Sequence, residues 1–144
     1  LGFDFFNKPQ KIKNKFTIDQ KVNQNHRGDG ATQKKILSNL RKLNIKNVKL
    51  IPGDVCLTTK HYVKNNVGFR ISMLILDVDN YEGTLECLKN LYPNITRGGI
   101  IVFDEYALEK YGESDAVDEF FRNKKLKIKT ISWASTPSAY VIKE

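Results

Sequence analysis

The sequence predicts an α/β domain built around a mostly parallel sheet, on three observations. Residues 70–76, RISMLIL, form a near-continuous apolar run, which is typical of a strand with helices on both faces. Such runs alternate with segments whose apolar residues recur every three or four positions, the pattern of strand–helix–strand units. Near the end, residues 125–132 alternate and residues 138–143 follow a proline turn, so these two segments are expected to close the sheet as an antiparallel pair.

The first half of the chain supplies two short strands and one helix. Residues 1–6, LGFDFF, are expected to form a buried strand that ends near Asp4. Residues 7–30 are polar and rich in turn formers, and they predict a long loop of the kind used as a lid or binding loop. From Ala31 the spacing becomes helical, with an apolar stripe formed by Ile36, Leu37, Leu40 and Leu43. A strand follows in NVKLIPGD and stops at its Pro-Gly pair.

The second half supplies three helices and a further strand. Residues 57–66 are expected to be helical, and residues 81–92 form a clearer helix that ends at the following proline. The glycines at 98–99 are expected to turn the chain into the strand 100–103. Ser114 is expected to cap a last helix, whose apolar face carries Ala116, Val117, Phe120 and Phe121.

The composition is that of a folded globular domain, with 40% apolar and 28% charged residues. A length of 144 residues suits one domain with a sizeable core, so residues 1–144 are treated as a single domain. The net charge of +8 is concentrated in residues 1–64, whose balance is +10, against −2 for residues 65–144. These lysines lack interleaved aromatic residues and a nucleic-acid motif, so we expect a solvated basic surface and no nucleic-acid partner.

Cellular location is predicted from the cysteines and the apolar runs. Cys56 and Cys87 stand 31 positions apart in no metal-binding pattern, so we expect reduced thiols in a cytoplasmic protein. No apolar run approaches the roughly 20 residues of a membrane helix, and no signal peptide opens the chain, so no membrane partner is expected. The chain starts at Leu1 and its one methionine is Met73, which we interpret as part of a longer protein.

Two of the apolar runs end in acidic residues. Asp77 and Asp79 follow the first run, and Asp104 and Glu105 follow IIVF in the second. The intervening helix makes the two strands parallel, so both acidic pairs leave the sheet at one edge, on strands about 4.8 Å apart. This carboxyl edge is where open α/β sheets bind their ligands.

Carboxylates gathered at one edge repel one another, and protons or a cation must relieve the repulsion. Hard divalent ions take oxygen ligands, so a Mg²⁺ site formed by Asp77, Asp104 and Glu105 is predicted. The alternative is structural: Asp79 or Asn80 can cap the following helix, and Glu105 can be an ordinary surface residue.

Residues 74–106, LILDVDNYEGTLECLKNLYPNITRGGIIVFDEY, strongly resemble the macrocin O-methyltransferase family. The segments GFDFF, LIPGDV and AVDEFF match the same family in the same order, so the resemblance covers most of residues 1–6 and 34–121. Members of the family are S-adenosylmethionine-dependent enzymes that methylate sugar hydroxyls of natural products. The resemblance implies a Rossmann-like class I methyltransferase fold, S-adenosylmethionine and Mg²⁺ as cofactors, and a small-molecule or glycan sugar as acceptor. Enzymes of this kind often dimerise, so a homodimer is expected.

The resemblance also implies roles for single residues. The family's metal-binding positions fall on Asp77, Asp104 and Glu105. Asp4 falls at the strand end that holds the cofactor ribose, and Gly53 and Asp54 fall where the adenine is held. The corresponding structural alternatives are a turn aspartate at position 4 and a plain Pro-Gly-Asp turn. Glu105 stands where the family often has Asp, which keeps the oxygen ligand on a longer arm.

Two features depart from the family. NKPQ at 7–10 replaces an EGFP-like turn, and the glycine-rich motif of the first strand is missing. The glycines at 28–30 are no substitute, because no strand precedes them. We therefore expect the carboxy-terminal portion of an enzyme, with the absent strand lying between the strand of Asp4 and that of Asp77. Such a chain should bind cofactor poorly or borrow a strand from a partner.

The implied reaction is an in-line methyl transfer from a sulfonium to a hydroxyl. A bound metal lowers the hydroxyl pKa and aligns the oxygen. Asp79, or a metal-binding carboxylate such as Asp77, is expected to take the proton, with His61 a more distant candidate. The expected acceptor is a vicinal hydroxyl pair on a sugar.

Other function classes also fit parts of the sequence. LDVDNYEGT suits a phosphohydrolase, with one Asp attacking phosphate, and it suits the Asp-x-Asp of a nucleotide-sugar transferase. A basic, non-enzymatic binding module using the lysines of residues 8–64 is a further alternative. The second acidic strand end favours the methyltransferase.

Overall fold

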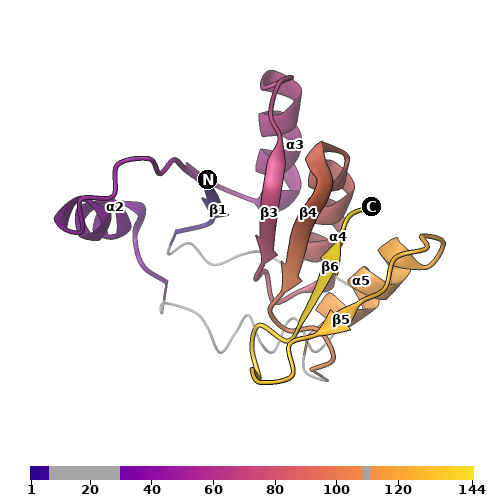
Figure 1. Ribbon diagram of the computed structural model, residues 1–144. Coiled ribbons are helices and arrows are strands. Elements are labelled where there is room, and N and C mark those ends of the chain that lie inside the picture. The colour runs from indigo at the N-terminus through magenta and orange to yellow at the C-terminus, as the bar shows by residue number, and fades with distance from the viewer. Residues whose placement is uncertain (7–29, 109–110) are drawn as a thin grey trace.

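The computed structural model describes residues 1–6, 30–108 and 111–144 of the chain. Within them the strands and helices alternate and divide between two sheets (Figure 1). Most of the loop expected at 7–30 lies outside the described residues, as do Gly28 and Asp29.

The smaller sheet pairs β1 (Gly2–Asp4) with β2 (Leu50–Pro52) in parallel. They are joined through α2 (Gln33–Lys42), which Thr32 caps by accepting the backbone N–H of Lys35. No residue of α2 is buried, and the helix stands apart from the other helices in Figure 1. The predicted helix therefore forms, but its apolar stripe has no core to enter among the described residues.

The larger sheet has the strand order β3-β4-β6-β5. Strand β3 (Ile71–Leu76) pairs with β4 (Ile95–Phe103) in parallel, and β4 pairs with β6 (Ala139–Ile142) in antiparallel orientation. The edge strand β5 (Lys129–Thr130) is antiparallel to β6. The predicted parallel pair and closing hairpin are confirmed, although β5 is shorter than the segment expected to form it.

One face of this sheet is covered by α3 (Val55–Asn65), α4 (Tyr81–Leu91) and α5 (Glu113–Phe121), which lie behind it in Figure 1. Helix α4 packs between α3 and α5. The core between the helices and the sheet consists of aliphatic and aromatic side chains, the most buried being Leu88, Ile101, Phe103, Val117 and Val141. This packed unit positions the ends of β3 and β4.

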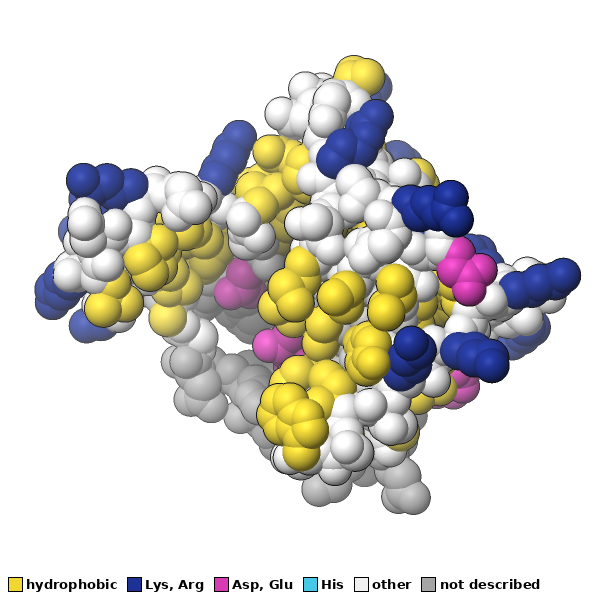
Figure 2. Space-filling model, viewed as in Figure 1, with side chains coloured by type: hydrophobic (Ala, Val, Ile, Leu, Met, Phe, Trp, Pro, Cys, Tyr) yellow, Lys and Arg dark blue, Asp and Glu magenta, His cyan; other side chains and the backbone are white. Residues whose placement is uncertain are grey.

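The opposite face of the larger sheet is open among the described residues. The expectation that β3 is buried on both faces is wrong, because Met73 and Ile75 are 57% and 61% exposed. The register places Met73 beside Ile100 and Ile100 beside Ile142, so an apolar row crosses three strands. Figure 2 shows hydrophobic side chains gathered on this face. Strand β3 is apolar, as predicted. An apolar sequence alone, however, does not show whether both faces of a strand are covered by other parts of the protein.

Two local predictions need correction. Strand β4 begins at Ile95, before the glycines expected to precede it, and those glycines form an irregularity inside the strand. Gly98 has φ 76°, and a Cβ on Gly99 would lie 2.6 Å from the Ile95 Cγ2, so side chains are excluded there. Ser114 does not cap α5, because its hydroxyl accepts the backbone N–H of Ala107 and the cap position is Gly112.

Candidate functional site

The carboxyl ends of β3 and β4 lie side by side, as the sequence predicts. Leu76 pairs with Phe103 at the last position of the register, and the Asp104 N–H donates to the Leu76 carbonyl at 3.0 Å. Asp77 and Asp104 therefore leave neighbouring strands at the same edge. We call residues 103–107, which carry Asp104 and Glu105 away from β4, the acidic turn.

The carboxylates at this edge affect one another's ionisation. Burial raises the pKa of Asp77, and the charges of Asp104 and Asp4 raise it further. The pKa of Glu105 is raised to about 7. Burial is the largest cause, and the negative charges of Asp104, Asp79 and Asp77 raise this pKa further. Five carboxylates from three strand ends thus share one electrostatic environment.

Asp79 and Asn80 have separate roles at the start of α4. The Asn80 side-chain oxygen accepts the Gly83 N–H at 2.7 Å, so Asn80 is the N-cap. Asp79 precedes it with φ 59°, a left-handed conformation that costs a non-glycine residue about 1 kcal/mol or more. Of the two candidate caps, Asn80 is therefore the one used, and strain of this kind tends to occur at functional sites.

The ends of β1 and β2 form the other side of the site. The Gly53 N–H donates to the Asp4 carbonyl at 3.0 Å, which holds the two strand ends together. Gly53 has φ 132°, and a Cβ there would lie 3.0 Å from the Thr58 methyl group, so the turn requires glycine. The Asp54 carboxylate caps α3 by accepting the Cys56 N–H at 2.9 Å. Asp54 thus has a structural role as a helix cap, which was not among the expectations from the sequence.

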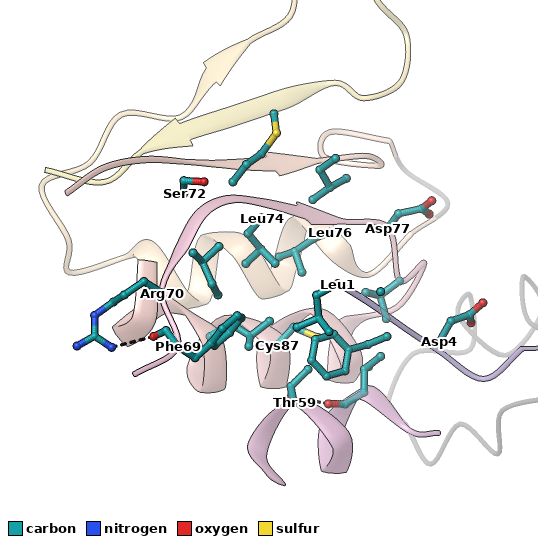
Figure 3. Close-up of a pocket in the computed structure, with 18 residues that line it drawn as sticks. Leu1, Asp4, Thr59, Phe69, Arg70, Ser72, Leu74, Leu76, Asp77 and Cys87 are labelled. Atoms are coloured by element: carbon teal, nitrogen blue, oxygen red, sulfur yellow. Dashed lines mark hydrogen bonds between the residues drawn. The ribbon is translucent and has the colours of Figure 1, made fainter. Parts of the chain in front are cut away.

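A cleft of about 630 Å³ separates β1 from β3 (Figure 3). Its walls are residues 1–4 and 69–78, and Thr59 of α3 and Cys87 of α4 also line it. Asp4 and Asp77 lie at the same end of the cleft in Figure 3. Among the described residues β3 pairs with β4 alone, so its other edge faces this cleft. The cleft lies at the position where a further strand is expected from the sequence.

Glu113 is a site residue that the sequence analysis missed. It is fully buried at the first position of α5, and its Oε1 accepts the Glu105 N–H at 2.9 Å. Burial raises the pKa of Glu113 to about 8, against the lowering effect of this hydrogen bond. A signal was present, because Glu113 precedes Ala116 and Val117 by three and four positions and so shares the apolar face of α5.

The candidate metal ligands fit a hard cation by their chemistry, since all are carboxylate oxygens. The Oε2 atoms of Glu105 and Glu113 are buried without a hydrogen-bond partner. In the part of the chain that the structure describes, however, no three His, Cys, Asp or Glu side chains are gathered as a metal-holding group. His61 is exposed on α3 and does not line the cleft.

Comparison with known proteins assigns the family. The model of the macrocin-O-methyltransferase (TylF) family matches residues 3–139. The chain belongs to this family. The TylF assignment supports the methyltransferase prediction over the phosphohydrolase, the nucleotide-sugar transferase and the basic binding module.

Relatives of this TylF-family chain include two enzymes of Streptomyces. It is 34% identical to the 8-demethyl-8-(2,3-dimethoxy-alpha-L-rhamnosyl)-tetracenomycin-C 4'-O-methyltransferase of Streptomyces olivaceus, over 35% of this chain and 23% of that protein. It is 40% identical to the demethyldecarbamoylnovobiocin O-methyltransferase of Streptomyces niveus, over 35% of this chain and 19% of that protein.

Solved structures of similar fold cover nearly the whole chain. The O-methyltransferase NovP aligns with a TM-score of 0.81 and 23% identity, over 98% of this chain and 58% of NovP. The calicheamicin methyltransferase CalS11 aligns with a TM-score of 0.77 and 23% identity, over the same two shares. The TylF-family chain thus has a methyltransferase fold and spans little more than half the length of these structures.

In the described residues, no helix has the length and apolar character required to cross a membrane.

Proposed function

We propose that this chain is the carboxy-terminal portion of an S-adenosylmethionine-dependent O-methyltransferase that acts on a sugar hydroxyl of a natural product or glycan. The observation that carries the proposal is the shared edge, where Asp4 and Asp77 lie at the same end of one cleft and Asp104 follows the strand next to that of Asp77. The family match over residues 3–139 and the named activities of the two relatives support the reaction class.

The cofactor is proposed to bind at the ends of β1 and β2. Asp4 is the proposed acceptor of hydrogen bonds from the ribose hydroxyls, and the support is its position at the end of β1 beside the cleft. The turn through Gly53 and Asp54 is the proposed adenine contact, through its backbone, since the Asp54 carboxylate is already engaged in capping α3.

Mg²⁺ is proposed to bind Asp77, Asp104 and Glu105. The support is the oxygen-only donor set and the mutual repulsion of these carboxylates, which a cation would relieve. When bound, such an ion lowers the pKa of a coordinated hydroxyl. Side-chain rotations would be needed to bring the three carboxylates together.

Asp77 and Asp79 are the proposed catalytic bases. In the reaction, the bond from the methyl carbon to the sulfonium sulfur breaks and a bond to the acceptor oxygen forms, while the hydroxyl proton passes to a carboxylate. Burial and neighbouring charges raise the pKa of Asp77, which makes it a better proton acceptor than an ordinary aspartate. Asp79 lies two residues further along the same loop, held in its left-handed conformation.

The cleft between β1 and β3 is proposed to hold one further strand of the same enzyme. The support is the edge of β3 that pairs with no other described strand, the apolar lining of the cleft, and the length by which NovP and CalS11 exceed this chain. A homodimer and a cytoplasmic location stay predictions of the sequence.

The test is a calorimetric titration of S-adenosylhomocysteine, with and without Mg²⁺, into the chain and into a longer protein that includes the preceding strand. Saturable binding that weakens at least tenfold in Asp4→Asn supports the proposal. Asp115→Asn is the matched control, because Asp115 is an exposed aspartate on α5. Absence of binding by the folded longer protein would refute it.

A further inference from the structure

The acidic turn is fixed to α5 by an unusual buried carboxylate. Glu113 is fully buried, and its Oε1 accepts the Glu105 N–H across eight residues of chain. Burying a carboxylate is costly unless it makes compensating interactions, and a neutral residue at the start of α5 would avoid the cost. The burial therefore points to a specific use of Glu113, whose carboxylate contacts the backbone of the acidic turn.

A second attachment holds the acidic turn from the start of β6. Ser138 lies just before β6, and its hydroxyl contacts the carbonyl oxygens of Asp104 at 3.1 Å and Tyr106 at 2.6 Å. The Ser138 N–H also donates to the carbonyls of Phe103 and Asp104. The start of β6 thus fixes the carbonyl groups of the turn, while Glu113 fixes an N–H group.

The rest of the turn is equally constrained. The Asp104 N–H donates to Leu76 of β3, and the Ala107 N–H donates to the Ser114 hydroxyl at 2.8 Å. Ala107 has φ 67°, a left-handed conformation that a non-glycine residue keeps only where its surroundings enforce it. A turn that carries two repelling carboxylates would otherwise have many arrangements, so these attachments select one.

We propose that Glu113 and Ser138 are positioning residues that hold the acidic turn in the arrangement needed to bind a divalent cation. They act through the backbone of residues 104–106 and need not touch the ion. This inference rests on the proposed function, in which Asp104 and Glu105 face the ion, and it adds two residues that the sequence analysis did not select.

The test combines two measurements on the full chain and on the longer protein. Amide hydrogen exchange by NMR reports whether the Glu105 N–H is protected, and calorimetric titration with Mn²⁺ alone reports cation affinity. The variants are Glu113→Ala, Glu113→Gln and Ser138→Ala, with Asp115→Asn as the control. Asp115 lies in the same first turn of α5 and is exposed, so its variant removes an acidic side chain from that turn of the helix without touching the acidic turn.

The expected result is that Glu113→Ala loses protection of the Glu105 amide and about 10- to 100-fold in Mn²⁺ affinity, the usual cost of removing a residue that orients a ligand. Glu113→Gln keeps an acceptor oxygen and should preserve the protection, and Asp115→Asn should match wild type. If Glu113→Ala fails to fold, Ser138→Ala, which removes one hydroxyl, should still weaken Mn²⁺ binding.

Three results are contrary to these expectations. Wild-type Mn²⁺ affinity in folded Glu113→Ala, or in folded Ser138→Ala, would overturn the positioning role. Rapid exchange of the Glu105 amide in wild type would overturn it as well. Failure of wild type to bind Mn²⁺ would instead refute the proposed metal site, and the exchange data would still show whether Glu113 orders the turn.

Discussion

The two sides of the cleft differ in how their functional residues are supported. The β3–β4 side rests on a packed core with three helices, and its acidic turn is hydrogen-bonded to β3, α5 and β6. The β1–β2 side is a two-stranded sheet of three-residue strands, and its connecting helix α2 has no buried residue. The carboxylates proposed for metal and proton chemistry are thus held by a well-packed unit. The side proposed to bind the cofactor instead has an open cleft at its border.

The largest expected effect is on stability. Phe103 is fully buried in the core and meets Phe121 edge-on, so Phe103→Ala should lower the free energy of unfolding by about 3–5 kcal/mol. Phe3→Ala in β1 should cost only about 1 kcal/mol, because Phe3 is half-buried beside Tyr62 in the smaller sheet. Urea unfolding measures both, and equal losses would contradict the contrast between the two sides.

Loss of an acidic-turn carboxylate should abolish most activity. In the longer enzyme, Asp104→Asn should lower metal-dependent turnover by about 100-fold or more, which corresponds to roughly 3 kcal/mol of transition-state stabilisation. Its fold should be unchanged, because the Asp104 backbone makes the contacts to Leu76 and Ser138. Turnover is measured at saturating S-adenosylmethionine, with Asp115→Asn as the charge-matched control. Unchanged turnover would exclude Asp104 from the site.

The buried carboxylates should make stability depend on pH. The pKa of Glu113 is raised from 4.5 to about 8, so the unfolded state loses its proton first. Stability should therefore fall as pH rises from about 5 to 8, and Glu113 alone should contribute up to about 1.4 kcal/mol per pH unit. In chelator-containing buffer, Glu113→Gln should make the free energy of unfolding depend less steeply on pH. The smaller pH dependence due to Glu105 should remain. An identical slope in wild type and Glu113→Gln would show that Glu113 is not buried as described.

The smallest effect separates the two interpretations of Asp54. Asp54→Ala removes the N-cap of α3 and should cost about 1 kcal/mol, whereas Asp54→Ser can still cap. If the side chain serves only as a cap, Asp54→Ser should bind S-adenosylhomocysteine like wild type. Calorimetry checks this, and a tenfold loss with unchanged stability would show a direct cofactor contact by the carboxylate.

The sequence predicted what local patterns determine. The apolar runs located β3 and the end of β4, and the acidic residues that follow them do share one edge, because parallel register is fixed by the strand–helix–strand connection. Because the sequence has no glycine-rich motif, a further strand was expected between the strands of Asp4 and Asp77. The cleft beside β3 lies at that position.

Other features depend on contacts between distant segments, which sequence patterns do not reveal. Ser114 is of a residue type that often caps helices, but its hydroxyl accepts a hydrogen bond from the Ala107 N–H instead. Glu113 looks like an ordinary acidic first-turn residue of a helix until the path of the acidic turn brings Glu105 to it. The exposure of Met73 and Ile75 likewise depends on which layers are present, not on the composition of β3.

The further strand proposed for the cleft beside β3 would complete the proposed cofactor side of the site. Amide hydrogen exchange of β3 tests it most directly, comparing this chain with a longer protein that includes the preceding strand. The β3 amides that do not bond to β4 should exchange rapidly in the chain and slowly in the longer protein. Equal protection of these amides in both proteins would contradict the claim.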